Sequence, residues 1–196
     1  MQPNTYCENC VYFPCWELDE DTEVVDCDHK KEKMSMEIIR VQEIDELTKQ
    51  RLKGIEKMFT EGFEGEIVKR KFSWQSFLSY WDVALRLPWN GLWLLIDEVD
   101  EDKVYGLIGG TVFPNILTDD KIAAETCWRT AASVKGQGKG WELLEAFLAW
   151  AIGEMGATKV ITHRFLHKDA ASDERFDTKI KAMGFYGSGC EYYMDV

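Results

Sequence analysis

The 196-residue sequence predicts an α/β (α+β) protein whose elements follow the order β-α-α-β-β-β-α-β-α-β. Stretches with apolar residues at helical spacing alternate with short runs that have the composition of strands. A run of three alternating glycines lies between a predicted strand and a predicted helix. Hydrophobic residues make up 45% of the chain, which is enough for one main domain with a buried core.

The regular pattern begins at Met36 with a short strand over 37–41 and two helices. Apolar residues at helical spacing predict a helix over 43–62, with Gly62 as its stop. Ser73 is a suitable N-cap for a second helix over 74–87, which the following proline ends.

The second half is predicted to be rich in strands. The acidic turn at Asp100–Asp102 separates two of them, and this pattern is typical of a hairpin. Helices are predicted over 139–155 and 173–183, with a glycine after each. The predicted strands are 91–99, 103–112, 121–130, 159–167 and 191–196.

The glycine run Lys135-Gly136-Gln137-Gly138-Lys139-Gly140 indicates a phosphate or pyrophosphate site. Glycines at the start of a helix let an anion approach backbone N–H groups and the positive end of the helix dipole. A P-loop is excluded, because Ser133 stands at its opening glycine and Gly140 at its hydroxyl position. The dinucleotide fingerprint also fails, because its third glycine falls on Trp141 or Leu143.

The same residues resemble the pyrophosphate motif [QR]-x-x-G-x-[GA] of the GNAT superfamily, the acyl-CoA-dependent N-acetyltransferases. Lys135 replaces the usual Arg or Gln, and Leu143-Leu144 matches the leucine pair that follows the motif. The helix that closes on Gly184-Phe185 matches the family's motif B, and the element order from about Met36 also agrees. The resemblance covers about four-fifths of the chain.

This resemblance implies a GNAT acyl-CoA N-acyltransferase fold, with a mixed, mostly antiparallel central sheet flanked by helices. The domain would span 36–196 and follow a Cys-rich extension over 1–35. Acetyl-CoA is the implied cosubstrate, bound where the fourth and fifth strands separate. The implied cofactor-binding residues are Trp128, Thr130, Lys135, Gly136, Gln137, Gly138, Lys139 and Gly140.

Catalysis by direct attack of an amine needs a base, stabilisation of an oxyanion and a proton for the thiolate. Glu125 and His163 are the candidate bases. The resemblance puts the usual Glu at Ala124, so Glu125 needs a strand irregularity to share its face. A solvated Glu125 and a hydrogen-bonded strand His163 remain the alternatives.

The general acid departs from the family pattern. Ile180 occupies the usual Tyr position, and Asp173 the usual Asn position. Tyr192 is a substitute candidate, although a tyrosine in a closing strand can equally be a packing residue. The alternative function is therefore a catalytically inactive GNAT-fold protein that acts as a CoA-binding or protein-interaction module.

Four cysteines near the N-terminus predict a zinc site. Cys7, Cys10, Cys15 and Cys27 fall within 21 positions, and His29 is an alternative ligand. A short acidic segment has little apolar surface to bury, and a metal would explain how it folds. Free thiols or disulfides are the alternatives.

The formal net charge of −12 argues against nucleic-acid binding and favours a cationic acceptor, such as a small-molecule amine or a peptide or protein amine. No apolar stretch approaches the ~20 residues of a membrane span. The first residues lack a basic region followed by an apolar one, so a cytoplasmic protein is predicted. The resemblance leaves a homodimer open.

Overall fold

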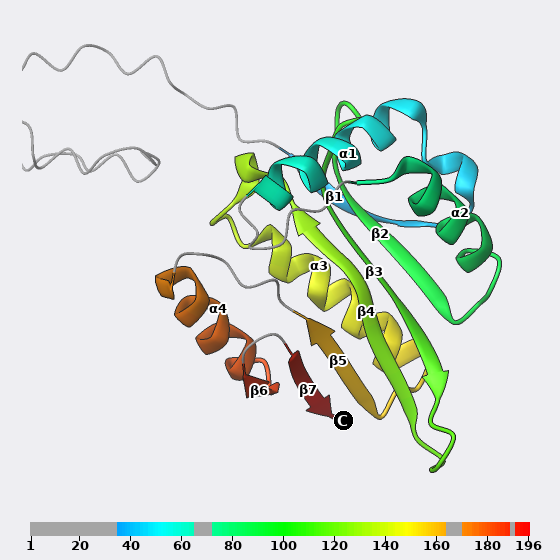
Figure 1. Ribbon diagram of the computed structural model, residues 1–196, viewed down its shortest axis with the longest axis vertical. Coiled ribbons are helices and arrows are strands. Elements are labelled where there is room, and N and C mark those ends of the chain that lie inside the picture. The colour runs from blue at the N-terminus through cyan, green and yellow to red at the C-terminus, as the bar shows by residue number, and fades with distance from the viewer. Residues whose placement is uncertain (1–34, 65–71, 164–169, 189–190) are drawn as a thin grey trace, which may run out of the picture. The chain divides into compact units, whose positions relative to one another are not determined.

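The computed structural model describes residues 35–64, 72–163, 170–188 and 191–196, and these form a seven-stranded sheet flanked by helices (Figure 1). The strands are β1 (Met36–Val41), β2 (Asn90–Asp97), β3 (Val104–Pro114), β4 (Lys121–Thr130), β5 (Lys159–His163), β6 (Tyr186–Ser188) and β7 (Glu191–Asp195). Their order is β1-β2-β3-β4-β5-β7-β6. Among the described strands, β4 and β5 are the one pair that is parallel. The predicted mixed, mostly antiparallel sheet is confirmed.

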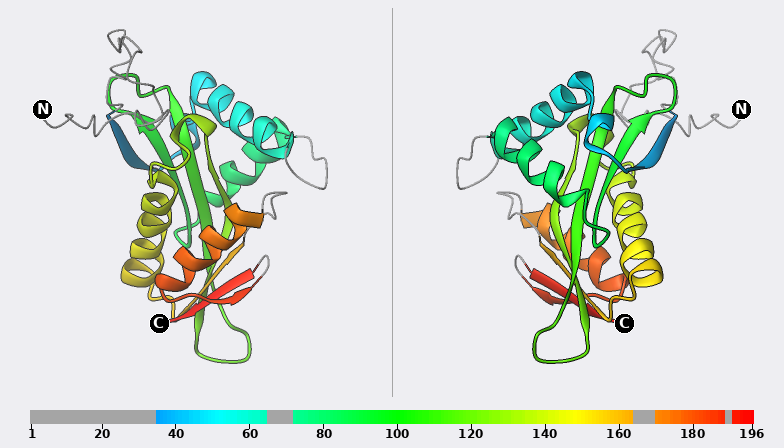
Figure 2. Two further views of the ribbon diagram at one scale, coloured as in Figure 1. Left: turned by 90° about the vertical axis from the view of Figure 1, so that its left-hand side faces the viewer. Right: turned by 90° about the vertical axis from the view of Figure 1, so that its right-hand side faces the viewer.

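Helices cover both faces of this sheet. Figure 2 shows α3 on one face, and α1 and α2 on the other. The helices are α1 (Lys49–Glu64), α2 (Trp74–Ala84), α3 (Lys139–Leu148) and α4 (Ala170–Ala182). A π-helical stretch over Ala149–Glu154 continues α3.

Two adjacent glycines in β3 let the helices on both faces reach the middle of the sheet. A Cβ on Gly109 would lie 2.4 Å from the ring of Trp81 in α2, and one on Gly110 would lie 2.4 Å from Phe147 in α3. Successive side-chain positions of a strand point to opposite faces, so the two rings press on β3 from opposite sides. This packing fixes α2 and α3 next to the part of β4 that carries the candidate site.

The sheet divides between β4 and β5. The two strands pair at only three positions, the last of which is Ala124 with Ile161. Beyond this point β4 continues to Thr130 along β3, whereas β5 continues to His163 along β7. Figure 1 shows the two strands diverging from their common end. We call this divergence the fork.

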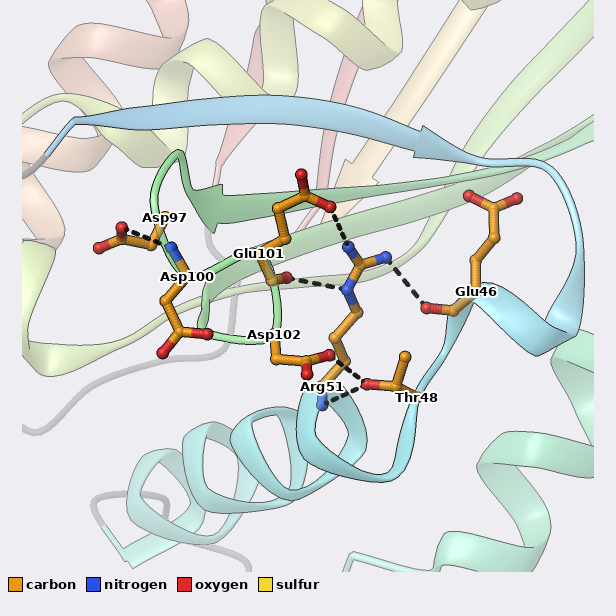
Figure 3. A network of polar contacts seen from close by, with 7 residues as sticks. All are labelled: Glu46, Thr48, Arg51, Asp97, Asp100, Glu101 and Asp102. Carbon is orange, nitrogen blue, oxygen red and sulfur yellow. Dashed lines mark hydrogen bonds and ion pairs between the residues drawn. The ribbon is translucent and has the colours of Figure 1, made fainter.

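A network of polar contacts fixes the start of α1 to the turn between β2 and β3 (Figure 3). The buried Arg51 donates from Nε to the Glu101 carbonyl at 2.9 Å and from Nη1 to the Glu46 carbonyl at 3.0 Å. Thr48 Oγ1 donates to Asp102 Oδ1 at 2.6 Å. The network thus connects two segments about fifty residues apart in the chain.

The predicted helix over 43–62 was wrong at both ends. Ile44–Glu46 forms a separate 3₁₀ turn, in which Glu43 and Glu46 make a capping box. The α-helix then begins at Lys49 and continues past Gly62, because a single glycine costs a helix only about 1 kcal/mol. The Ser73 N-cap is confirmed, since Ser73 Oγ accepts the N–H of Ser76 at 3.3 Å.

The strand predictions differ from the structure mainly near the C-terminus. Strand 121–130 is confirmed, whereas the three-residue β6 was missed because so short a strand shows no alternation. Within the predicted strand 159–167, β5 ends at His163, and residues 164–167 lie outside the described part. The division between residues 1–35 and 36–196 stays a prediction.

Candidate functional site

The glycine run forms an open loop at the start of α3. Gly136 and Gly138 have φ of +83° and +80°, and Gly138 is the N-cap of the helix. These are left-handed conformations that residues with a Cβ rarely adopt. A Cβ on either glycine would meet nothing within 4 Å. Backbone conformation, rather than close packing, therefore explains these glycines, and the loop surface is accessible.

Several amides of this loop make no hydrogen bond to a backbone carbonyl of the described residues. Within the described residues, the N–H groups of Gly136, Gly138, Lys139 and Gly140 donate to no backbone carbonyl. The first N–H groups of a helix attract anions. The side chain of Lys139 bridges to Glu142 at 2.8 Å, while Lys135 is exposed. The geometry is therefore that of an anion site built from backbone N–H groups.

The end of β4 lies against this loop. Trp128 donates from Nε1 to the carbonyl of Gly140 at 3.1 Å. The methyl group of Thr130 would be 3.5 Å from a Cβ on Gly140. The structure thus brings the two predicted residues of β4 together with the glycine loop. Their role in cofactor binding stays a prediction.

A bulge interrupts β4 at the fork. Gly109 of β3 pairs with Cys127, whereas the next residue, Gly110, pairs with Glu125, so Thr126 has no partner in this ladder. An extra residue shifts the alternation of side chains between the two faces. The irregularity that a role for Glu125 requires is therefore present, one residue after it.

Glu125 bridges the two arms of the fork immediately after their last backbone pair. Its carboxylate is buried, and Oε2 accepts the N–H of His163 at 3.1 Å and the Thr162 hydroxyl at 3.3 Å. Burial raises the pKa of Glu125 above its ordinary value, and these two donors oppose that effect. The Glu125 carboxylate thus accepts the His163 N–H of β5, a role that a backbone carbonyl of β4 would have if the two strands were still paired.

His163 completes a carboxylate–imidazole pair. Its Nδ1 lies 4.0 Å from Glu125 Oε2, and its side chain is 46% exposed. The two residues that the sequence analysis named as separate candidate bases are therefore neighbours. A buried carboxylate beside an accessible imidazole is an arrangement suited to proton transfer.

The comparisons with known proteins identify the family. Residues 52–176 match the model of the acetyltransferase (GNAT) family, which is more than half of the chain. The chain belongs to the GNAT acetyltransferase family. None of the curated proteins compared with this sequence matches it.

Solved GNAT structures show the same fold. An acetyltransferase of this family from Staphylococcus aureus Mu50 is 14% identical and covers 82% of this chain and 99% of its own, with a TM-score of 0.59. Glucosamine-6-phosphate N-acetyltransferase from Arabidopsis thaliana is 13% identical, with 79% and 94% coverage and a TM-score of 0.55. A structure of the NatC complex bound to Gag peptide and CoA is 12% identical, with 82% and 99% coverage and a TM-score of 0.54.

The residue that the resemblance puts at the family's tyrosine position is Ile180, which carries no ionisable group. Ile180 is fully buried in α4. Tyr192 is also fully buried, and its hydroxyl donates to Asp177 Oδ1 at 2.9 Å. A phenol held in this way is suited to fixing α4 against β7. Its predicted role as an acid stays untested.

Tyr80 in α2 is a candidate that the sequence analysis missed. Its side chain is about half exposed, and Thr126 at the bulge is close enough to lower its pKa in opposition to burial. Burial raises the pKa of the Tyr80 phenol, which keeps it protonated over a wide pH range. No sequence signal links Tyr80 to the fork, because the contact depends on how α2 packs on Gly109.

The predicted zinc ligands Cys7, Cys10, Cys15, Cys27 and His29 lie outside the described residues, so the zinc site stays a prediction. Among the described residues, no three His, Cys, Asp or Glu side chains gather as metal ligands would. None of the helices in the described ranges has the length and hydropathy to cross a membrane.

Proposed function

We propose that this GNAT protein transfers an acetyl group from acetyl-CoA to an amine. The observation that carries the proposal is the open glycine loop at the start of α3, which β4 connects directly to the fork. Membership of the family supports acyl transfer from an acyl-CoA. The CoA pyrophosphate would receive the amides of Gly136, Gly138, Lys139 and Gly140 and the positive end of the α3 dipole.

Lysine side chains would add charge at this position. Lys135 is exposed and can turn to the phosphates. Lys139 already pairs with Glu142, but such a partly exposed pair contributes little stability, so the ammonium can exchange partners. The thioester arm would then extend along the free edge of β4 towards Glu125.

The proposed reaction is a direct attack at the fork. The amine nitrogen forms a bond to the thioester carbon, and the carbon–sulfur bond breaks. His163 accepts the amine proton at Nε2, while Glu125 orients the ring through Nδ1. A backbone N–H of β4 at the bulge would stabilise the oxyanion. Tyr80 is our preferred donor of a proton to the CoA thiolate.

The acceptor class is part of the same proposal. A net charge of −12 attracts a cationic amine, whether it belongs to a small molecule or to a peptide. A polyamine and a peptide N-terminus both fit this description. A panel of such amines would distinguish them by the mass of the acetylated product.

A second candidate function is a GNAT-fold protein that binds CoA or a protein partner without acyl transfer. The observation that favours it is Ile180, which is fully buried where the family pattern has a tyrosine. This candidate predicts CoA binding without acetylated product. It also predicts that substitution of His163 has no effect on any cellular function of the protein.

Calorimetric titration with acetyl-CoA followed by mass spectrometry of amine products tests both candidates. Gly138→Val should abolish binding, because Val cannot adopt φ of +80° easily and its side chain would project into the open loop. His163→Gln should retain binding and lose product. Absence of acetyl-CoA binding at sub-millimolar concentrations in the unaltered protein would contradict the acetyltransferase proposal.

A further inference from the structure

Four aromatic rings meet beyond the fork, and we call them the fork cluster: Trp128 in β4, Trp141 in α3, Phe176 in α4 and Tyr192 in β7. The ring centroids of Phe176 and Trp141 are 5.1 Å apart. Those of Phe176 and Trp128 are 5.8 Å apart, and those of Phe176 and Tyr192 are 5.7 Å apart. These separations are in the range of direct aromatic contact.

The fork cluster joins two arms that no longer share backbone hydrogen bonds. Trp128 and Trp141 belong to the arm with the glycine loop, and their rings are 5.6 Å apart. Tyr192 belongs to the other arm, where it pairs with Thr162 of β5 and donates to Asp177 of α4. Among these rings, Phe176 contacts members of both arms.

A second contact also holds α4 to the arm that carries the glycine loop. Lys179 Nζ lies 4.9 Å from the centroid of the Trp141 ring, which is within cation–π distance. Phe176 and Lys179 are three residues apart and therefore lie on one face of the helix. The described conformation thus has α4 closed against the start of α3.

We propose that Phe176 is a gate on the cofactor cleft, and that acyl-CoA binds only after this ring leaves the fork cluster. The inference rests on the proposed function, because it requires the thioester arm to pass between β4 and β5. In the described conformation the Phe176 ring contacts Trp128 of β4 and Tyr192 of β7, one residue on each arm of the fork. Binding therefore selects an open conformation that is less populated than the closed one.

The gate predicts that truncating Phe176 strengthens CoA binding, whereas truncating an ordinary contact residue weakens it. When only a fraction of the molecules is open, the apparent dissociation constant is the intrinsic one divided by that fraction. Removal of three ring contacts should raise the open fraction, and so tighten CoA binding by roughly 10- to 100-fold. A residue that simply contacts the cofactor would weaken binding when it is truncated.

The experiment is a calorimetric titration of the full chain with CoA, in the unaltered protein and in Phe176→Ala and Phe176→Leu. We expect tighter binding in both variants, with the larger gain for Ala. Phe113→Ala is the matched control, because that ring lies exposed on β3 near the far end of the sheet. Its affinity for CoA should equal that of the unaltered protein.

The outcomes separate the gate from the proposed function. If the unaltered protein binds CoA and the Phe176 variants bind it equally or more weakly, the gate is wrong and the CoA site stands. If no variant binds CoA, both are wrong. Gly138→Val should remove the tighter binding from a Phe176→Ala background, and retained binding there would also overturn the gate. Should Phe176→Ala fail to fold in thermal scans, Phe176→Leu decides the result.

Discussion

Arg51 and Glu125 are both charged and both only 7% exposed, but their surroundings differ. Arg51 donates to two carbonyls and also faces the carboxylate of Glu101 at 3.8 Å. Within the described residues, Glu125 accepts from a neutral amide and a hydroxyl, and the half-exposed imidazole of His163 lies 4.0 Å away. The first environment satisfies a permanent charge. The second leaves a group that can change its protonation state.

This difference indicates distinct roles. The Arg51 network lies at the turn between β2 and β3 and connects it to the start of α1 (Figure 3). The Glu125 pair lies where β4 and β5 separate and faces solvent through His163. Substitution of Arg51 should therefore lower the stability of the fold, and substitution of Glu125 should lower the rate of acetyl transfer.

The largest expected effect is on stability at Arg51. Arg51→Met should lower the free energy of unfolding by about 3 kcal/mol, because it removes a buried guanidinium that donates to two part-buried carbonyls. Urea denaturation measures this change. Arg86→Met is the control, since Arg86 is exposed and pairs with Asp82 one turn away. It should change stability by less than about 0.5 kcal/mol. Equal effects at the two positions would contradict the anchoring role.

The next effect is on turnover at Glu125. Glu125→Gln keeps an oxygen that can accept the His163 amide but removes the charge that orients the imidazole. We expect acetyl transfer to fall by about 10²-fold, in the range typical of general acid–base catalysis. The affinity for acetyl-CoA should stay unchanged in a titration. An unaltered rate would show that Glu125 only caps β5.

A third prediction concerns pH. Because burial raises the pKa of Glu125 in the fold, the folded chain binds this proton more tightly than the unfolded chain does. The contribution of Glu125 to stability is therefore fully present below its ordinary pKa of 4.5, and is lost as pH rises through the raised value. Melting temperatures between pH 4 and 7 should show a smaller decline with rising pH in Glu125→Gln. Parallel curves for the two proteins would contradict the burial effect.

The smallest expected effect is on stability at His163. Its ring is 46% exposed, so His163→Gln should change the free energy of unfolding by less than about 0.5 kcal/mol. The same variant should lose acetyl transfer if His163 is the base. A stability loss as large as that of Arg51→Met would assign His163 to the scaffold instead.

Local patterns were sufficient to predict much of the fold. The bounds of β4 follow from the composition of that segment. The N-cap of α2 follows from the hydroxyl of Ser73, which directly precedes the helix. The start of α1 was missed because Glu43 and Glu46 close a separate turn, and helical spacing alone does not reveal that competition.

The candidate site was predictable only in its contiguous part. The glycine loop is a single segment, so its residues could be named from the sequence. Glu125 and His163 come from two strands, and their contact depends on the pairing register and on the bulge at Thr126. Phe176 meets Trp141 only because α4 packs across the fork. Tertiary packing of this kind leaves no periodic signal in the chain.

The adjacent glycines of β3 have a consequence for any map of mutational tolerance. At Gly109 and Gly110 even a methyl group would overlap an indole or a phenyl ring. In a selection for function, variants with almost any substitution at Gly109 or Gly110 should therefore be lost. The loss should be as strong as for variants at the proposed catalytic residues. In this chain the least replaceable positions would include two that need never touch a ligand. Loss of variants from a selection would therefore not by itself locate the active site. The amount of folded protein has to be measured separately from its catalytic rate.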